Sequence, residues 1–175
     1  RDKDGEELIL VHGTTTREVR ADQQAVAQQQ LAYCGIELDI VGYSSDIFFT
    51  TYAEGAPCAT GELEICEWSA STAYPDPDSS RWLISEIPSD EFPDGVNDQH
   101  LVDEDLDALF QQQKTQVDFA QRQATFSEIS KYMTENVIWL GVWYDPDAFG
   151  VSGRLKNVRI SGASPFFSFA VWERE

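Results

Sequence analysis

Few residues of this sequence have the types and spacing that catalysis or metal binding requires. The two histidines, His12 and His100, lie far apart, and neither has a second ligand at the spacing of a metal site. The sequence contains no GxSxG, HExxH or phosphate-binding glycine motif. We therefore expect no catalytic residue, no metal and no cofactor, and we expect His12 to be a structural histidine at a strand end.

Carboxylates are the other source of chemistry, and they are concentrated in one part of the chain. Residues 37–107 contain 18 of the 31 acidic residues and a single base, Arg81. Two carboxylates at a catalytic separation are the minimum for a glycosidase-like hydrolase, but so acidic a stretch contains such pairs by chance. An acid-pair hydrolase is therefore the less favoured alternative to a protein that is not an enzyme.

The overall charge excludes several classes of partner. The net charge is −19 and the isoelectric point is near 4.2. Sequence-independent nucleic-acid binding needs a basic face, and so does adhesion to an anionic membrane. No apolar run approaches the roughly 20 residues of a membrane-spanning helix. We expect no nucleic-acid partner, and membrane association only through an upstream anchor outside this chain.

Aromatic residues at predicted strand ends are the better candidates for a binding site. Five Trp, six Tyr and ten Phe make up 12% of the chain. In open α/β sheets the ligand crevice lies outside the carboxyl ends of the strands, where Trp and Tyr can stack on a ligand. The alternative is that these rings are ordinary core residues. The candidate ligand-binding residues are Thr14 after the first strand, Trp68, Ser69, Ala70 and Ser71 after the third, and Tyr144 and Asp145 after the last.

The elements that would position these residues begin with a strand–helix–strand unit. The apolar run 8–11 predicts a buried strand, and alternation over 36–43 predicts a second one. Between them, residues 18–34 show apolar residues at the helical period, which predicts a buried face containing Val19, Val26 and Tyr33. Gly35 is placed to end this helix. The two strands should then be parallel.

The rest of the chain predicts a third strand, two helices and a last strand. Residues 63–68 alternate cleanly, and residues 69–102 form a long loop rich in Pro, Ser, Asp and Gly. Helices are predicted over 103–114 and 119–136, and an aromatic strand over 138–144. This order of elements predicts an α/β fold with a mixed sheet flanked by helices.

The three cysteines leave one pairing open. Cys58 and Cys66 lie eight residues apart across a glycine-containing turn, so either a disulfide or two half-buried free thiols fits the sequence. A disulfide would be favoured in an exported protein. Cys34 lies at an apolar helix end and is expected in the core.

Motifs in a consistent order resemble a known family. Residues 2–8 resemble a KDGKPL turn and strand, and residues 63–69 followed by Pro75-Asp76-Pro77-Asp78 resemble a W…DPDP segment. Residues 105–109 resemble an E(L/V)DALL helix start, and residues 118–140 resemble a TD…R…PWIPL segment. Together they are similar to the extracellular solute-binding proteins of family 5, the oligopeptide- and dipeptide-binding proteins of ABC transporters.

The resemblance implies a fold, a function and a location. The chain would be one α/β lobe, residues 1–175, of the type II periplasmic-binding-protein class, with 155–175 a C-terminal extension packing on a first lobe outside the chain. The protein would capture an extracytoplasmic solute, most often a peptide, and deliver it to the permease subunits of an ABC importer. It would be periplasmic or extracellular, in some members lipid-anchored as a lipoprotein.

One position of this sequence departs from the family's pattern. Peptide binders of the family hold the ligand's amino terminus with an Asp shortly after the Trp of the third strand, and the matching position here is Ser71. An oligosaccharide or another non-peptide solute is therefore an alternative ligand, unless Asp76 or Asp78 takes over after a loop shift.

Overall fold

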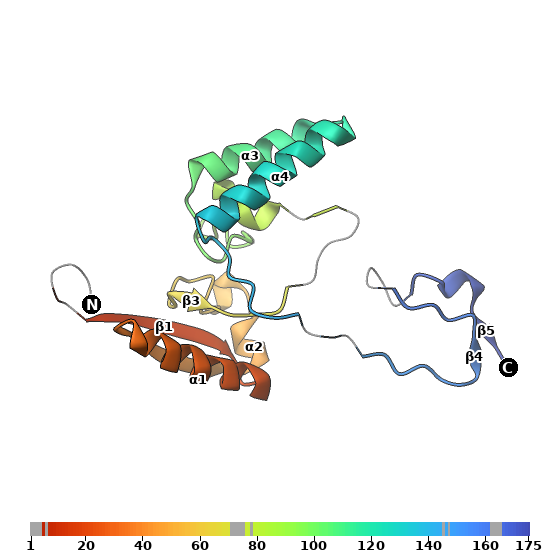
Figure 1. Cartoon of the computed structure of the whole chain (residues 1–175), viewed down its shortest axis with the longest axis horizontal. Helices are drawn as coiled ribbons and strands as arrows, with labels where there is room; N and C mark the ends of the chain where they lie inside the picture. The colour runs from red at the N-terminus through yellow and green to blue at the C-terminus, as the bar shows by residue number, and fades with distance from the viewer. Residues whose placement is uncertain are drawn as a thin grey trace. The chain divides into compact units, whose positions relative to one another are not determined.

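In a computed structural model, the described residues are 5, 7–70, 76–77, 79–144, 146, 148–161 and 166–175. They fall into two units, each considered by itself below (Figure 1). Unit 1 contains the chain up to Trp68 and residues 79–139, and unit 2 contains residues 69–78 and 140–175. The expected extension 155–175 lies wholly within unit 2. The expectation of a single lobe remains a prediction.

The strand–helix–strand prediction is confirmed in unit 1. Strand β1 (Leu8–Thr15) pairs in parallel with β2 (Ile36–Tyr43), and helix α1 (Glu18–Tyr33) connects them. Gly35 takes a positive φ of 78° just after the helix, a conformation that glycine adopts without steric cost. Strand β3 (Ile65–Cys66) pairs with the other edge of β1, so the sheet order is β2-β1-β3.

The buried face of α1 is polar, which corrects the prediction from periodicity. Val19, Val26 and Tyr33 are exposed, whereas Arg20 and Gln24 are buried. The Gln24 amide donates to His12 O at 2.7 Å, and the Arg20 guanidinium donates to the Thr15 hydroxyl at 2.8 Å. Hydrogen bonds to strand β1 therefore orient the helix where apolar packing was expected. Cys34 is also exposed, contrary to expectation.

The third predicted strand is shorter than its sequence pattern, and the last predicted strand is not formed by the described residues. Of residues 63–68, only Ile65 and Cys66 pair with a neighbouring strand, and described residues 138–144 form no strand. The long segment before the helical pair contains the short helices η2 (Ser80–Trp82) and η3 (Ile84–Glu86). A pattern of side chains alone does not supply the partner strand that a ladder needs.

Two long helices form the apolar core of unit 1, close to their predicted bounds. Helix α3 (Glu104–Thr115) and helix α4 (Phe119–Glu135) pack side by side (Figure 1). Each begins with an aspartate whose carboxylate accepts a backbone N–H of the first turn, Asp103 for α3 and Asp118 for α4. The buried core residues are Leu83, Leu106, Phe110 and Ile129.

A buried asparagine organises the loop before α3. Asn97 is fully buried, and its amide donates to Leu83 O and Leu101 O at 3.0 Å each. Its side-chain oxygen accepts Leu101 N–H at 3.0 Å, and its own N–H donates to Glu86 O. The loop thus has defined partners for its backbone groups without belonging to a helix or a sheet.

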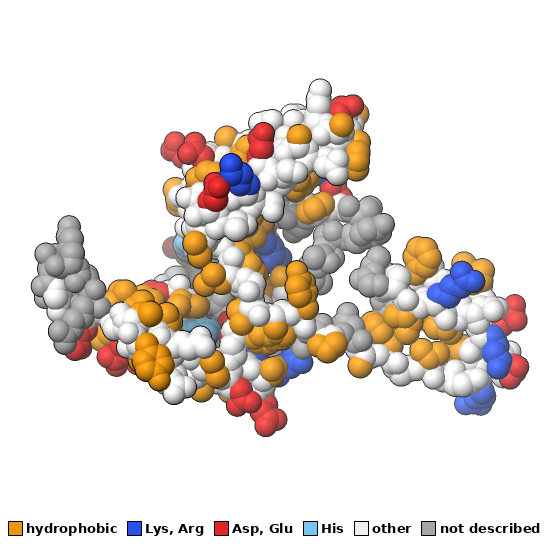
Figure 2. Space-filling model, in the orientation of Figure 1, with side chains coloured by type: hydrophobic (Ala, Val, Ile, Leu, Met, Phe, Trp, Pro, Cys, Tyr) orange, Lys and Arg blue, Asp and Glu red, His pale blue; other side chains and the backbone are white. Residues whose placement is uncertain are grey.

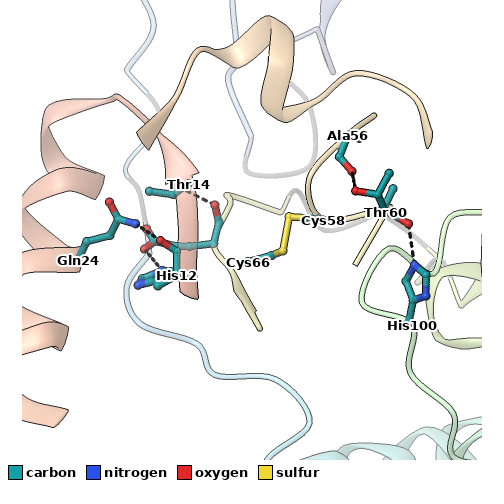
Figure 3. Close-up of a disulfide and its surroundings, with 10 residues drawn as sticks. His12, Thr14, Gln24, Ala56, Cys58, Thr60, Cys66 and His100 are labelled. Carbon is teal, nitrogen blue, oxygen red and sulfur yellow. Dashed lines mark hydrogen bonds and ion pairs between the residues drawn. A yellow bond between two sulfur atoms is a disulfide. The ribbon is translucent and has the colours of Figure 1, made fainter. Parts of the chain in front are cut away.

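The disulfide left open by the sequence is present. Cys58 and Cys66 are bonded, which ties β3 to the turn after α2 (Ser45–Phe48) and η1 (Tyr52–Glu54). On the far side of that turn, His100 Nε2 lies 2.6 Å from Ala59 O. Figure 3 shows the disulfide between the β1 residues on one side and His100 on the other.

Unit 2 contains a small antiparallel pair. Strand β4 (Leu155–Lys156) pairs with β5 (Glu173–Arg174), and η4 (Phe169–Val171) precedes β5. The hydroxyl of Ser168 accepts the Arg159 N–H at 2.7 Å and the Trp172 indole N–H at 2.9 Å. Hydrophobic side chains are visible on the surface of this unit in Figure 2.

Candidate ligand-binding site

A cluster of aromatic rings lies where β3 leads out of the sheet. Trp68 contacts Trp139 edge to face, with ring centroids 5.4 Å apart. Trp139 contacts Trp82 in the same manner at 5.2 Å, and Trp82 lies parallel to Phe110 at 6.4 Å. Offset and edge-to-face contacts of this kind fix ring orientations. We call these four residues the tryptophan cluster.

The tryptophan cluster is both anchored and accessible. Phe110 is buried in the helical core and Trp82 packs against that core. Trp68 is half-buried, and Trp139 is 37% exposed. The outer rings are therefore available to a ligand, whereas the inner rings hold them in place.

Thr14 is tied to the segment that carries Trp68. It is fully buried, and its hydroxyl donates to Glu67 O at 2.7 Å. The Glu67 N–H in turn donates to Gly13 O at 3.0 Å. In this arrangement Thr14 fixes the backbone beside Trp68, while its role as a direct ligand contact stays a prediction.

Next to this segment lies a buried pair of titratable side chains. His12 Nε2 and Glu67 Oε2 are 3.2 Å apart, with 5% and 13% of the two side chains exposed. Burial lowers the pKa of the His12 imidazole below its usual value. Burial also raises the pKa of the Glu67 carboxyl, and the positive charge of Arg20 offsets part of that rise.

The other predicted site residues belong to unit 2 or lie outside the described residues. Ser69, Ala70 and Tyr144 are exposed and belong to unit 2. Ser71 and Asp145 lie outside the described residues. Their roles as ligand contacts therefore stay predictions, and the geometry of unit 1 groups Trp68 with the segment that Thr14 holds.

Sequence reasoning missed Trp82 and Trp139 as site residues. Trp139 was expected inside a strand, and Trp82 lay in a segment expected to be mainly loop. The signal available in the sequence was the number of tryptophans, five in 175 residues. Which of them meet depends on how α4 returns towards β3, and no local pattern encodes that.

Two further kinds of feature are not found among the described residues. No group of three or more His, Cys, Asp or Glu among them is placed to hold a metal ion. Within the same residues, every helix is too short or too polar to cross a membrane.

Solved structures, but not sequences, match this chain. No family model and no curated protein matches the sequence. The oligopeptide-binding protein AppA from Bacillus subtilis, solved with a nonapeptide, matches all of this chain with a TM-score of 0.68 and 17% identity. A putative peptide-binding protein AppA from Clostridium difficile matches 99% of the chain with a TM-score of 0.71 and 21% identity. NikA from Brucella suis, solved with Fe(III)-EDTA, matches 79% with a TM-score of 0.56 and 21% identity.

These matches cover only part of the other proteins. This chain spans 35% of each AppA chain and 26% of NikA. The fold that the motifs led us to expect is nevertheless confirmed. The chain has the α/β fold of the corresponding part of these type II periplasmic-binding-protein-like structures.

Proposed function

We propose that this chain is part of the solute-binding component of an ABC importer. The observation that carries the proposal is the tryptophan cluster, which presents Trp68 and Trp139 at the carboxyl end of β3. In α/β folds of this kind the ligand lies outside the carboxyl ends of the strands. The chain captures a solute without chemical reaction, and the clustered rings supply its apolar contact surface.

A peptide is the first candidate ligand. One matched structure is an oligopeptide-binding protein with a bound nonapeptide, and a second is named as a putative peptide-binding protein. An oligosaccharide is the alternative, because indole rings also pack against the apolar faces of sugars. Fe(III)-EDTA in a third matched structure indicates that this fold also accepts ligands that are neither peptide nor sugar.

The proposal extends to location and partners. A disulfide such as Cys58–Cys66 forms and persists in oxidising compartments, which supports a periplasmic or extracellular protein. In this role the captured solute passes to permease subunits in the membrane. A lipid anchor upstream of this chain would keep the protein at the membrane surface.

Ligand titration tests the function and the site together. We expect calorimetry with panels of short peptides and of oligosaccharides to identify a ligand whose binding changes the tryptophan fluorescence. Trp68→Ala should weaken that binding at least tenfold, as truncation of a central aromatic contact usually does. Trp139→Ala should weaken it less, because part of the Trp68 surface remains.

Phe119→Ala is the matched control. Phe119 is also an exposed aromatic residue of unit 1, 78% exposed, but it lies at the opposite end of α4 from Trp139. Its removal should leave affinity unchanged. Equal loss in the Trp68 and Phe119 variants, or no binding by any member of either panel, would contradict the proposal.

A further inference from the structure

The segment that carries Trp68 is held to the sheet by few contacts. Strand β3 pairs with β1 through only two residue pairs, His12 with Ile65 and Gly13 with Cys66. Beyond that ladder, Glu67 exchanges backbone and side-chain hydrogen bonds with β1 at Gly13 and Thr14. The last attachment is the contact between the side chains of His12 and Glu67.

The contact between His12 and Glu67 is polar and largely buried. The nitrogens and oxygens of the two side chains make no other hydrogen bond within the described residues. Only 4% of His12 is exposed, and within the described residues no hydrogen bond of good geometry reaches either its ring nitrogens or the two Glu67 carboxyl oxygens. The 3.2 Å separation between Nε2 and Oε2 is close enough for a proton to bridge them after a small rotation. A buried polar pair without other partners is costly unless its members satisfy each other.

We infer that His12 and Glu67 share a proton across β1 and β3, and that His12 is thereby a positioning residue for Trp68. This inference rests on the proposed function in one respect only, namely that Trp68 contacts the ligand. The pair joins the side chain next to Trp68 to the central strand of the sheet. When the shared proton bridges the two side chains, the segment that carries Trp68 is held to β1 twice, by the backbone ladder and by this contact.

The charged groups around the pair set its response to pH. Arg20 on α1 is the cation that acts on Glu67, and Glu64 on the β3 side lies at β1, where its carboxylate accepts the Val11 N–H. Since burial lowers the pKa of His12, the pair resists a second proton at mildly acidic pH. The contact weakens when both groups are protonated, because a neutral carboxyl accepts the imidazolium N–H less strongly than a carboxylate does.

Nuclear magnetic resonance of the full 175-residue chain tests the pair without any ligand. The chain has only two histidines, so a His100→Asn variant assigns both ring signals, and Asn suits the positive φ of 50° at position 100. We expect the His12 ring to titrate below the usual range of a histidine, because it is buried. We also expect the Trp68 signal, observed with fluorotryptophan, to shift at the His12 midpoint. The Glu67→Gln variant should abolish that linked shift.

A double-mutant cycle in Tm distinguishes a direct His12–Glu67 interaction from two independent structural effects. The changes in Tm caused by His12→Gln and Glu67→Gln should be non-additive in the double variant by several degrees at pH 7, whereas either combined with His100→Asn should be additive. A His12 midpoint at or above the usual value for histidine, a Trp68 signal insensitive to the His12 titration, or additive changes in Tm would each overturn the inference.

The ligand test separates this inference from the proposed function. If a panel ligand binds, its affinity should fall at least threefold below the His12 midpoint in the wild type but not in His12→Gln. If the Trp68 signal shifts at the His12 midpoint but no panel ligand binds, the inference about His12 and Glu67 is supported and the proposed solute-binding function is contradicted. If a ligand binds with an affinity that does not change with pH, the proposed function is supported and the inference about His12 and Glu67 is contradicted.

Discussion

Asp103 shows how a single residue can join two helices. Its carboxylate accepts the Leu106 N–H at 2.9 Å, which caps α3, and it also accepts the Tyr132 hydroxyl of α4 at 3.0 and 3.1 Å. Asp118 caps α4 in the same way, with its carboxylate accepting the Gln121 N–H at 2.9 Å. The two caps are therefore a matched pair that differs in the link between helices.

We expect the two cap substitutions to differ in cost. Asp118→Ala should lower the free energy of unfolding by about 1 kcal/mol, the usual value of an N-cap. Asp103→Ala should lower it by about 2 kcal/mol, because a hydrogen bond to a charged acceptor is lost as well. Urea denaturation measures both. If Tyr132→Phe added its full effect in the Asp103→Ala background, the proposed link would be wrong.

At the residue scale, the sequence predicted local roles better than long-range partners. The predicted helix starts, residues 103 and 119, lie within one residue of the observed starts of α3 and α4. The pairing of His12 with Glu67 spans 55 positions and depends on β3 lying beside β1, so the sequence supported only a buried, structural histidine. Thr14 was identified from its place at a strand end, but that place does not reveal that its hydroxyl is bonded to Glu67 O.

At the scale of elements, the disulfide compensates for a short strand. Strand β3 has two residues, and the bond from Cys66 to Cys58 closes a small loop beside it. Because the loop is short, chain entropy predicts a stabilisation of about 2–3 kcal/mol. The Cys58→Ser/Cys66→Ser variant should lose this amount in denaturant unfolding, and a reducing agent should produce the same loss in the wild type.

Cys34→Ser provides the control for this prediction. Cys34 is the free, exposed thiol at the end of α1, so its substitution should leave stability and the response to reductant unchanged. A reductant effect that persisted in the Cys58→Ser/Cys66→Ser variant would show that the loss arises elsewhere.

Elements that a local sequence pattern specifies were predictable, and elements that depend on contacts with distant residues were not. Strands β1 and β2 and helices α3 and α4 lie within a few residues of their predicted bounds, since strand pattern and caps encode them locally. The prediction of the buried face of α1 was wrong. Periodicity detects the spacing of Val19 and Val26 but not the hydrogen bonds of Arg20 and Gln24 to β1. The aromatic run 138–144 has strand-like composition, yet Trp139 packs on other rings instead of pairing in a sheet.

At the scale of the whole molecule, the unusual property is the net charge of −19. Many of the acids between residues 37 and 107 are exposed, including Glu37, Asp39 and Glu91. Like charges at this density repel one another in the folded state more than in the expanded unfolded chain. Dissolved salt screens that repulsion over a Debye length of about 10 Å at 0.1 M.

We therefore expect the chain to become more stable as salt is added. Raising sodium chloride from 0.05 to 0.5 M should raise Tm by several degrees, since about 1 kcal/mol corresponds to 2–4 °C for a chain of this size. The triple variant Glu37→Gln, Asp39→Asn and Glu91→Gln should show a smaller increase. Lys114→Gln, which removes an exposed positive charge, should show a larger one. Scanning calorimetry at both salt concentrations measures all three, and an identical increase in every variant would mean that salt acts through hydrophobic burial instead of through charge.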